Sequence, residues 1–339
     1  MALPTTSSDP SADDAAWDRC LKACIGALGL GLLVLFTFMI LVDPYDSGRF
    51  GLLGIDGMAD RNTTTATVSR ARDTNFDSAV IGNSTSQLLD PVELSRATGL
   101  NFVQLRVNGA SPAAELAVLD FFLRHHPGVR ALAIVTDPSW CVHDSAELLP
   151  DTFPFWLYAD STLGYAARVL SWPAVEHAFQ RLSIGLSLRK RDDPTGAFDP
   201  SDIRPEGVFR EINKPTDPRP AATAADRAVF PEVSRLSDIV KKLPPSVGVV
   251  VVVPPTFARF APQPGTVLAA EREACNAALS QIVAGRPHSN FINYRVDNAL
   301  TRDAANFEDF IHYRPIISTR VDAGIVLSLR EGAAAKIDF

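Results

Sequence analysis

The stretch SAVIGNSTSQLLD, residues 78–90, joins a short apolar run to small polar residues and then to a helix-like segment. The apolar part, residues 77–82, has the β-branched composition of a buried strand. It ends at a glycine, and the residues that follow are Asn83, Ser84, Thr85 and Ser86. Ligands bind beyond the carboxyl ends of the strands in an open parallel sheet. The stretch therefore predicts a strand whose end presents a hydroxyl side chain at a functional edge.

Strand-like and helix-like segments alternate along much of the remaining chain. Further strands are expected over residues 101–107, 130–136, 248–253 and 290–295, and helices over residues 87–98, 111–126, 232–243 and 266–285. Pro91 and Pro112 suit the first turns of two of these helices, and Ser111 suits an N-cap. Such alternation indicates a parallel sheet covered by helices on both faces. We expect an α/β fold, a flavodoxin-like doubly wound parallel sheet of about five strands.

Near the N-terminus, ACIGALGLGLLVLFTFMILV, residues 23–42, contains no charged residue. A helix of about 20 residues spans the hydrocarbon core of a bilayer. No small-x-small cleavage site follows, and the apolar run is longer than that of a signal peptide, so we expect an uncleaved anchor. Arg19 and Lys22 precede it, which favours a cytoplasmic segment 1–22. The protein is expected in the inner or cytoplasmic membrane, with its C-terminal domain periplasmic or extracellular.

Beyond the anchor, two kinds of segment are expected. Residues 43–75 are polar and are interpreted as an irregular connection, and residues 76–339 as one α/β domain. Within that domain, residues 139–227 interrupt the alternation after the third strand as a large insertion. Its aromatic side chains either pack together or stack on sugar rings. They are Trp140, Phe153, Phe155, Trp156 and Tyr158.

The overall charge and the cysteines narrow the classes of function. A net charge of −7 argues against a nucleic-acid partner, and the short basic run in SLRKRDD is interpreted as a solvated face. Of the 4 cysteines, only Cys141 and Cys275 lie away from the anchor. They form either a disulfide or two buried thiols. With no CxxC pair and no His/Cys cluster of metal-ligand spacing, we expect neither a metal nor a cofactor.

A nucleophile and its activating base are the most specific chemical prediction. On a strand-to-helix turn, Ser84 has an exposed hydroxyl and a backbone N–H suited to an oxyanion. In FEDFIHY, Asp309 lies three residues before His312, a spacing at which a carboxylate can orient an imidazole. The alternatives are that Ser84 is only a helix cap and that His312 is a surface histidine. Ser86 is the second candidate nucleophile.

In their order along the chain, these blocks resemble those of the SGNH or GDSL-like hydrolases. The resemblance implies a nucleophile at Ser84, an oxyanion glycine at Gly109 in RVNGAS, and an Asp-x-x-His block at Asp309 and His312. Within that superfamily the chain looks most like the membrane-anchored branch that acts on cell-envelope polymers. That branch includes proteins of alginate O-acetylation and teichoic-acid D-alanylation. The resemblance covers roughly residues 76–136 and 245–330.

Two positions depart from the pattern of this superfamily. The usual Asp before the nucleophile is Asn83 here, and Asp137 stands nearest to the usual Asn of the third block. An amide can brace the turn by hydrogen bonding much as a carboxylate does. An ionised Asp137, in contrast, would repel an oxyanion unless its side chain points elsewhere.

The resemblance implies a membrane-anchored serine esterase or O-acyltransferase with a Ser84–His312–Asp309 triad. Its substrate is expected to be an envelope polysaccharide or glycolipid, and a membrane acyl-transfer protein is a candidate partner. The alternative is a catalytically inactive SGNH-like binding or assembly protein of the cell envelope, for which Asp137 is the main argument.

Overall fold

A single five-stranded parallel sheet organises the domain. The computed structural model describes residues 10–59, 63–142, 152–199, 203 and 229–339. The strands are β1 (Ser78–Gly82), β2 (Phe102–Arg106), β3 (Ala131–Val135), β4 (Gly248–Val253) and β5 (Asn290–Asn293). They are hydrogen-bonded in the order β2-β1-β3-β4-β5, and every pairing is parallel. All five lie where the sequence predicts a strand, and the α/β class is confirmed.

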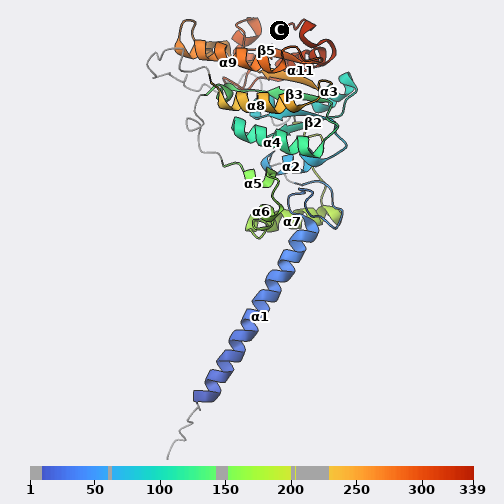
Figure 1. The fold of residues 1–339 in the computed structure, drawn as a ribbon, viewed down its shortest axis with the longest axis vertical. Helices are drawn as coiled ribbons and strands as arrows, with labels where there is room; N and C mark the ends of the chain where they lie inside the picture. Colours follow the sequence, from blue (N-terminus) through green and yellow to red (C-terminus); the bar gives the residue numbers. More distant parts are fainter. Residues whose placement is uncertain (1–9, 60–62, 143–151, 200–202, 204–228) are drawn as a thin grey trace, which may run out of the picture.

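Helices cover both faces of the sheet (Figure 1). One face packs against α2 (Thr63–Arg72), α4 (Pro112–His125), α8 (Pro231–Lys242) and α9 (Val267–Val283). The other packs against α3 (Pro91–Thr98) and α11 (Pro315–Glu331). Successive residues of a strand serve opposite faces, as Ile81 and Val80 do. Because both faces are buried, β1, β3 and β4 are apolar without alternation.

The caps of two helices follow the predicted chemistry. The Ser111 side chain accepts a hydrogen bond from the Ala114 N–H at the start of α4, and Pro112 occupies the first turn. Helix α3 begins at Pro91 with Asp90 as its N-cap. Both starting points were predicted from proline, which lacks an N–H that the first turn would leave unpaired.

The described chain also contains shorter helices. They are η1 (Ser84–Ser86), η2 (Pro138–Cys141), η6 (Ala258–Phe260), α10 (Ala299–Arg302), η7 (Ala304–Asn306) and η8 (Gly332–Ala334). The first two follow β1 and β3 directly, so they shape the edge at which the strands end.

Helix α1 (Pro10–Val42) projects from the domain as a single rod (Figure 1). Its Asp14–Val42 part is long and apolar enough to cross a membrane. Most of that surface is uncovered by the rest of the chain, and Leu28 is 65% exposed. Only the final turns enter the domain, where Met39 and Val42 join the core.

Among the described residues between β3 and α8, three α-helices connect the domain to the junction with α1. They are α5 (Phe155–Tyr158), α6 (Thr162–Ala166) and α7 (Trp172–Gly185). Figure 1 shows α6 and α7 beside the end of α1, with α5 between them and α4. The predicted insertion also includes residues 143–151, 200–202 and 204–228, which lie outside the described residues. Tyr158 stacks on Phe153, and Trp156 meets Tyr45 edge to face. For these aromatic rings the packing interpretation is confirmed.

Several helices of the described chain were not predicted, among them α2, α7 and α11. Residues 43–75 were expected to be irregular, yet α2 occupies Thr63–Arg72. Its sequence, TTTATVSRAR, is rich in weak helix formers, and its stability comes from burying residues such as Val68 against β2 and α4. Helix α11 follows the Asp-x-x-His block and buries Ile317, Val321 and Ile325, which recur every four residues.

Candidate active site

Ser84 lies directly beyond the carboxyl end of β1. Gly82 ends the strand, and Asn83 caps the short helix η1 that Ser84 begins. A Cβ atom at Gly82 would lie 2.9 Å from Ser86 Oγ and 3.1 Å from Val135 Cβ, so only glycine fits without a shift. The tight turn leaves the side chain of Ser84 half-buried at the sheet edge.

His312 connects Ser84 to Asp309. The Ser84 hydroxyl lies 2.9 Å from His312 Nε2, and His312 Nδ1 lies 2.8 Å from Asp309 Oδ2. An ionised carboxylate only accepts, so the proton belongs on Nδ1, and Nε2 is left to accept from the Ser84 hydroxyl. Ser84 and His312 are 228 positions apart in the sequence, and the prediction that they lie close together in the folded domain is confirmed.

Asp309 is held in place by its own loop. Its Oδ1 accepts from the N–H of Ile311 at 3.0 Å and from the N–H of His312 at 2.9 Å. Burial disfavours ionisation, but hydrogen bonds from the His312 ring and these two N–H groups outweigh it and lower the pKa of Asp309. The carboxylate is thus charged and fixed beside the imidazole.

Asn83 and Asp137 form one hydrogen-bonded pair. Asn83 Nδ2 donates to Asp137 Oδ2 at 2.7 Å, and Asn83 Oδ1 accepts from the Thr85 N–H and hydroxyl, both at 3.0 Å. The other oxygen of Asp137 accepts from the N–H of Ser139 at 2.8 Å and from its hydroxyl. Both carboxylate oxygens of Asp137 are therefore engaged by the loops after β1 and β3.

Gly109 and Ser86 have different places at this edge. Gly109 lies in the turn after β2 with φ +68°, a conformation that favours glycine. The turn is next to the end of β1, because the Val107 N–H donates to the Gly82 carbonyl at 3.1 Å. Ser86 is fully buried, and its hydroxyl donates to the Asn83 carbonyl at 2.8 Å. It braces the turn, so Ser84 is the better-placed nucleophile.

The Cys141–Cys275 disulfide forms in the structure. It joins η2, which follows Asp137, to α9, which passes over the ends of β4 and β5. Cys20 and Cys24 are free and exposed on α1. The cross-link thus fixes two elements at the edge that carries Ser84.

Glu115 supports η2 from beneath. The Trp140 indole N–H donates to Glu115 Oε2 at 3.2 Å. Burial, and then the charge of Asp137, raise the pKa of Glu115 well above its ordinary value and favour the neutral carboxyl. Helix α4 therefore places a buried, neutral carboxyl against the indole of η2.

A cavity of about 190 Å³ lies next to the triad. Pro138, Thr256 and Arg295, which line it, follow the ends of β3, β4 and β5, respectively. Leu268 and Arg272 of α9 also line it, and so does Ile311 from the loop that carries Asp309 and His312. The two arginines were not singled out from the sequence. A charged residue in NFINYR, at the end of the predicted fifth strand, was the available signal for Arg295.

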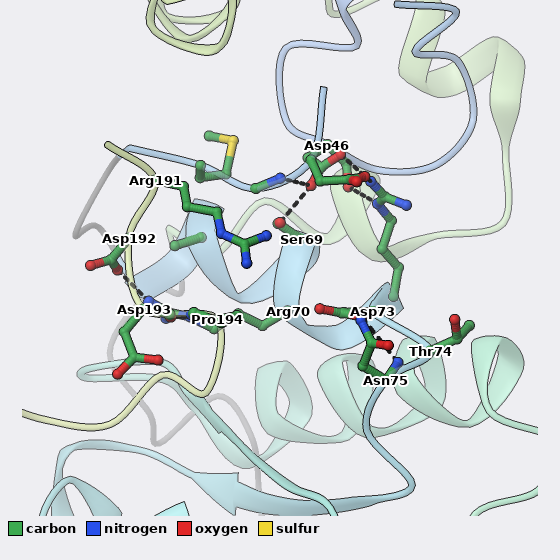
Figure 2. Close-up of a pocket in the computed structure, with 15 residues that line it drawn as sticks. Asp46, Ser69, Arg70, Asp73, Thr74, Asn75, Arg191, Asp192, Asp193 and Pro194 are labelled. Carbon is green, nitrogen blue, oxygen red and sulfur yellow. Dashed lines mark hydrogen bonds and ion pairs between the residues drawn. The ribbon is translucent and has the colours of Figure 1, made fainter. Parts of the chain in front are cut away.

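A second cavity, of about 270 Å³, lies between the segments around Asp46, α2 and residues 191–194 (Figure 2). No triad residue lines it. Several of its charged side chains are paired: Asp46 accepts from Ser69 at 2.6 Å and from Arg72, and Arg70 binds Asp192. These contacts join α2 to the segments next to the end of α1, and we interpret this cavity as structural.

Within the described ranges, no three His, Cys, Asp or Glu side chains gather as a group that could hold a metal ion. Comparisons with protein-family models, with curated proteins and with solved structures find no significant match.

Proposed function

We propose that the protein is a membrane-anchored serine esterase or O-acyltransferase of the cell envelope. The observation that carries the proposal is the continuous hydrogen-bonded chain from Ser84 through His312 to Asp309. A hydroxyl, an imidazole and a buried carboxylate in this order are the parts of an activated nucleophile.

Ser84 would act in two steps. In the first, Ser84 Oγ bonds to the carbonyl carbon of an acyl donor, His312 Nε2 takes the hydroxyl proton, and Asp309 stabilises the imidazolium. The backbone N–H groups of Ser84 and Gly109 are the proposed oxyanion donors. His312 Nε2 then gives this proton to the leaving group as the bond between that group and the acyl carbon breaks. In the second step His312 takes a proton from a hydroxyl or a water, and the oxygen of that molecule bonds to the acyl carbon. The bond from this carbon to Ser84 Oγ then breaks, and His312 returns the proton to Oγ.

The Asn83–Asp137 pair supports the resemblance to SGNH hydrolases. The two departures from that pattern are an amide where a carboxylate is usual and a carboxylate where an amide is usual. Here these side chains bind each other at 2.7 Å, so the two exchanges compensate. The strand order β2-β1-β3-β4-β5 supports the flavodoxin-like interpretation of the fold. Asp137 consequently no longer favours the inactive alternative.

Helix α1 is proposed to remain attached as an anchor. Arg181 of α7 is 1% exposed, donates to the carbonyls of Val42 and Asp43, and pairs with Asp46 at 2.7 Å. Cleavage near residue 42 would remove Met39 and Val42 from the core and expose this buried charge. A retained helix with an uncovered apolar surface requires a bilayer around it.

The base of the domain carries further apolar side chains suited to the membrane interface. Leu52 is 77% exposed, Trp172 74% and Phe179 57%. Leu52 and Phe179 lie near the end of α1: the neighbouring Leu53 N–H donates to the Leu41 carbonyl at 3.2 Å, and Phe179 contacts Phe38. If residues 23–42 cross the bilayer, this surface reaches the headgroups. The exposed basic run 189–191 beside it suits anionic lipids.

Spin labels test this placement in the full chain reconstituted into vesicles. On a Cys20→Ser, Cys24→Ser background, labels at Leu52→Cys and Phe179→Cys should be more accessible to oxygen than to a water-soluble nickel chelate. The control label at Val296→Cys, a residue 42% exposed on the loop after β5, should show the opposite preference. Equal accessibility at all three positions would exclude a membrane-bound base.

The disulfide and the expected cytoplasmic N-terminus support the proposed location and orientation of the domain. A disulfide between Cys141 and Cys275 forms in oxidising compartments, which supports an exported domain. With a cytoplasmic N-terminus, the C-terminal domain is then periplasmic or extracellular. Tethering raises the effective concentration of membrane-associated polymer near Ser84, which favours an envelope polysaccharide or glycolipid as the substrate and a membrane acyl-transfer protein as a partner.

The test has two parts, both with the full chain in detergent. A fluorophosphonate should label the wild type but not Ser84→Ala. With an activated acyl ester and a panel of envelope polysaccharides, mass spectrometry should find Ser84-dependent acylated glycan in excess of free acid. Rapid formation of free acid with no acylated or deacylated glycan would leave an esterase of small molecules. A folded protein that is never labelled would favour the binding or assembly alternative.

A further inference from the structure

The cavity beside the triad contains a cation with two buried nitrogens that lack a hydrogen-bond acceptor. Arg295 follows β5, and these nitrogens are its Nε and Nη2, which have no acceptor among the described residues. Burial, and then the neighbouring charge of Arg272, lower the pKa of Arg295 to about 10, and the charge of Asp137 offsets part of this shift. The guanidinium therefore stays charged at neutral pH. Buried N–H groups of a cation are costly without an acceptor, and such a cost persists where a ligand supplies the missing anion.

The second arginine concentrates positive charge in the same cavity. Arg272 of α9 donates to the Pro138 carbonyl, which fixes it over the end of β3. Apolar walls from Leu268 and Phe260 complete the lining. Two guanidinium groups in an apolar pocket suit a small anionic group attached to a carbon skeleton, because a guanidinium binds carboxylate or phosphate oxygens in pairs.

The position of the cavity ties it to the nucleophile. Ile311, which lines it, lies between Asp309 and His312, and Pro138 follows the residue that binds Asn83. Figure 1 shows β5 at the end of the sheet farthest from α1. A group held by Arg295 is thus beside the triad and away from the proposed bilayer surface.

We propose that the Arg295–Arg272 cavity binds a carboxylate or phosphate group of the molecule whose acyl ester Ser84 attacks or forms. The proposal deepens the function proposed above and rests on it for the role of Ser84. Arg295 supplies paired hydrogen bonds, Arg272 supplies charge, and the apolar walls receive the adjoining carbon atoms. The substrate class is accordingly an anionic envelope glycan or an anionic acyl donor, and a neutral ester lacks this contact.

Binding is measured first, because it does not depend on catalysis. The full-length Ser84→Ala protein in detergent is titrated with glutarate and with phenyl phosphate, and its thermal unfolding is followed. At least one of the two anions should raise Tm, and the anion that does so shows whether the cavity binds a carboxylate or a phosphate. Arg295→Gln should weaken binding at least tenfold, and Arg295→Lys should restore part of it. Arg259→Gln, which removes an exposed positive charge next to Phe260, should leave binding unchanged.

Stability and labelling separate the possible outcomes. Arg295→Gln should unfold near the wild-type temperature or above, because the substitution removes two buried nitrogens that lack an acceptor; a large decrease would indicate a structural arginine and overturn the proposal. The bound anion should slow fluorophosphonate labelling of wild-type Ser84. Binding that is identical in Arg295→Gln, or absent for both anions, overturns the proposal, as does binding that leaves labelling unaffected. Anion binding by a protein that is never labelled would refute the proposed function while the ligand class of the cavity stands.

Discussion

Replacing Ser84 with alanine should lower kcat for ester cleavage by about 10⁴- to 10⁶-fold, with KM little changed. The variant loses the atom that forms the covalent bond, while the oxyanion donors and the substrate pocket remain. Steady-state kinetics on a chromogenic ester, with the full chain in detergent, measures the effect. Thermal unfolding should be almost unaffected, because Ser84 is half-buried and its hydroxyl hydrogen-bonds the His312 imidazole rather than the backbone of the turn.

His312→Ala should cost about as much as Ser84→Ala, and the double variant little more, because the two groups act as a unit. Asp309→Asn should cost about 10³- to 10⁴-fold. The amide can still accept from the loop N–H groups, but its NH₂ would face His312 Nδ1 and drive the proton to Nε2. That tautomer cannot accept the hydroxyl proton of Ser84.

Ser86→Ala is the matched control on the same turn. It removes a buried hydrogen bond to Asn83, so it should destabilise the protein by about 1 kcal/mol yet retain fluorophosphonate labelling. Loss of labelling in Ser86→Ala together with its retention in Ser84→Ala would move the nucleophile to Ser86 and refute the proposed triad.

The strands were predictable from local sequence because each is a short apolar run between turn residues. The run GVVVVV, for example, is β4 in full. Helix α2 was not predictable in this way, because TTTATVSRAR favours no helix until β2 and α4 cover it. The C-terminal helix α11, in contrast, has a regular apolar spacing that is sufficient to predict it from local sequence.

In the candidate site, too, the residues that belong to local sequence patterns were predictable and those that meet only in the folded chain were not. Ser84, Asp309 and His312 were predicted because a strand end and an Asp-x-x-His spacing are local patterns. The Asn83–Asp137 contact joins residues 54 positions apart and depends on β1 and β3 being neighbours in the sheet. Arg295 and Arg272 meet only when α9 lies over the ends of the strands. Such tertiary juxtapositions leave no mark in a single sequence.

Removing the Cys141–Cys275 disulfide should lower the free energy of unfolding by about 3–5 kcal/mol, and Tm by about 10 °C. The bridged residues are 134 positions apart, so the bond restricts a large part of the unfolded chain. It also holds η2 against α9 beside the nucleophile. Loosening this contact should therefore reduce kcat/KM well below the new Tm, by displacing Asp137 from Asn83 and Arg272 from its cavity.

The comparison uses two double variants of the full chain, Cys141→Ser with Cys275→Ser and, as the matched control, Cys20→Ser with Cys24→Ser. The control removes the two free thiols of α1 and should unfold like the wild type. Dithiothreitol should lower Tm in the control as in the wild type and leave the first variant unchanged. A reductant effect of equal size in the variant without the bridge would show that the destabilisation has another origin. A loss of stability with unchanged kcat/KM would mean that the disulfide stabilises the fold without affecting the site. The hydrogen bond between Asn83 and Asp137 would then be sufficient to hold the loop after β3 in place.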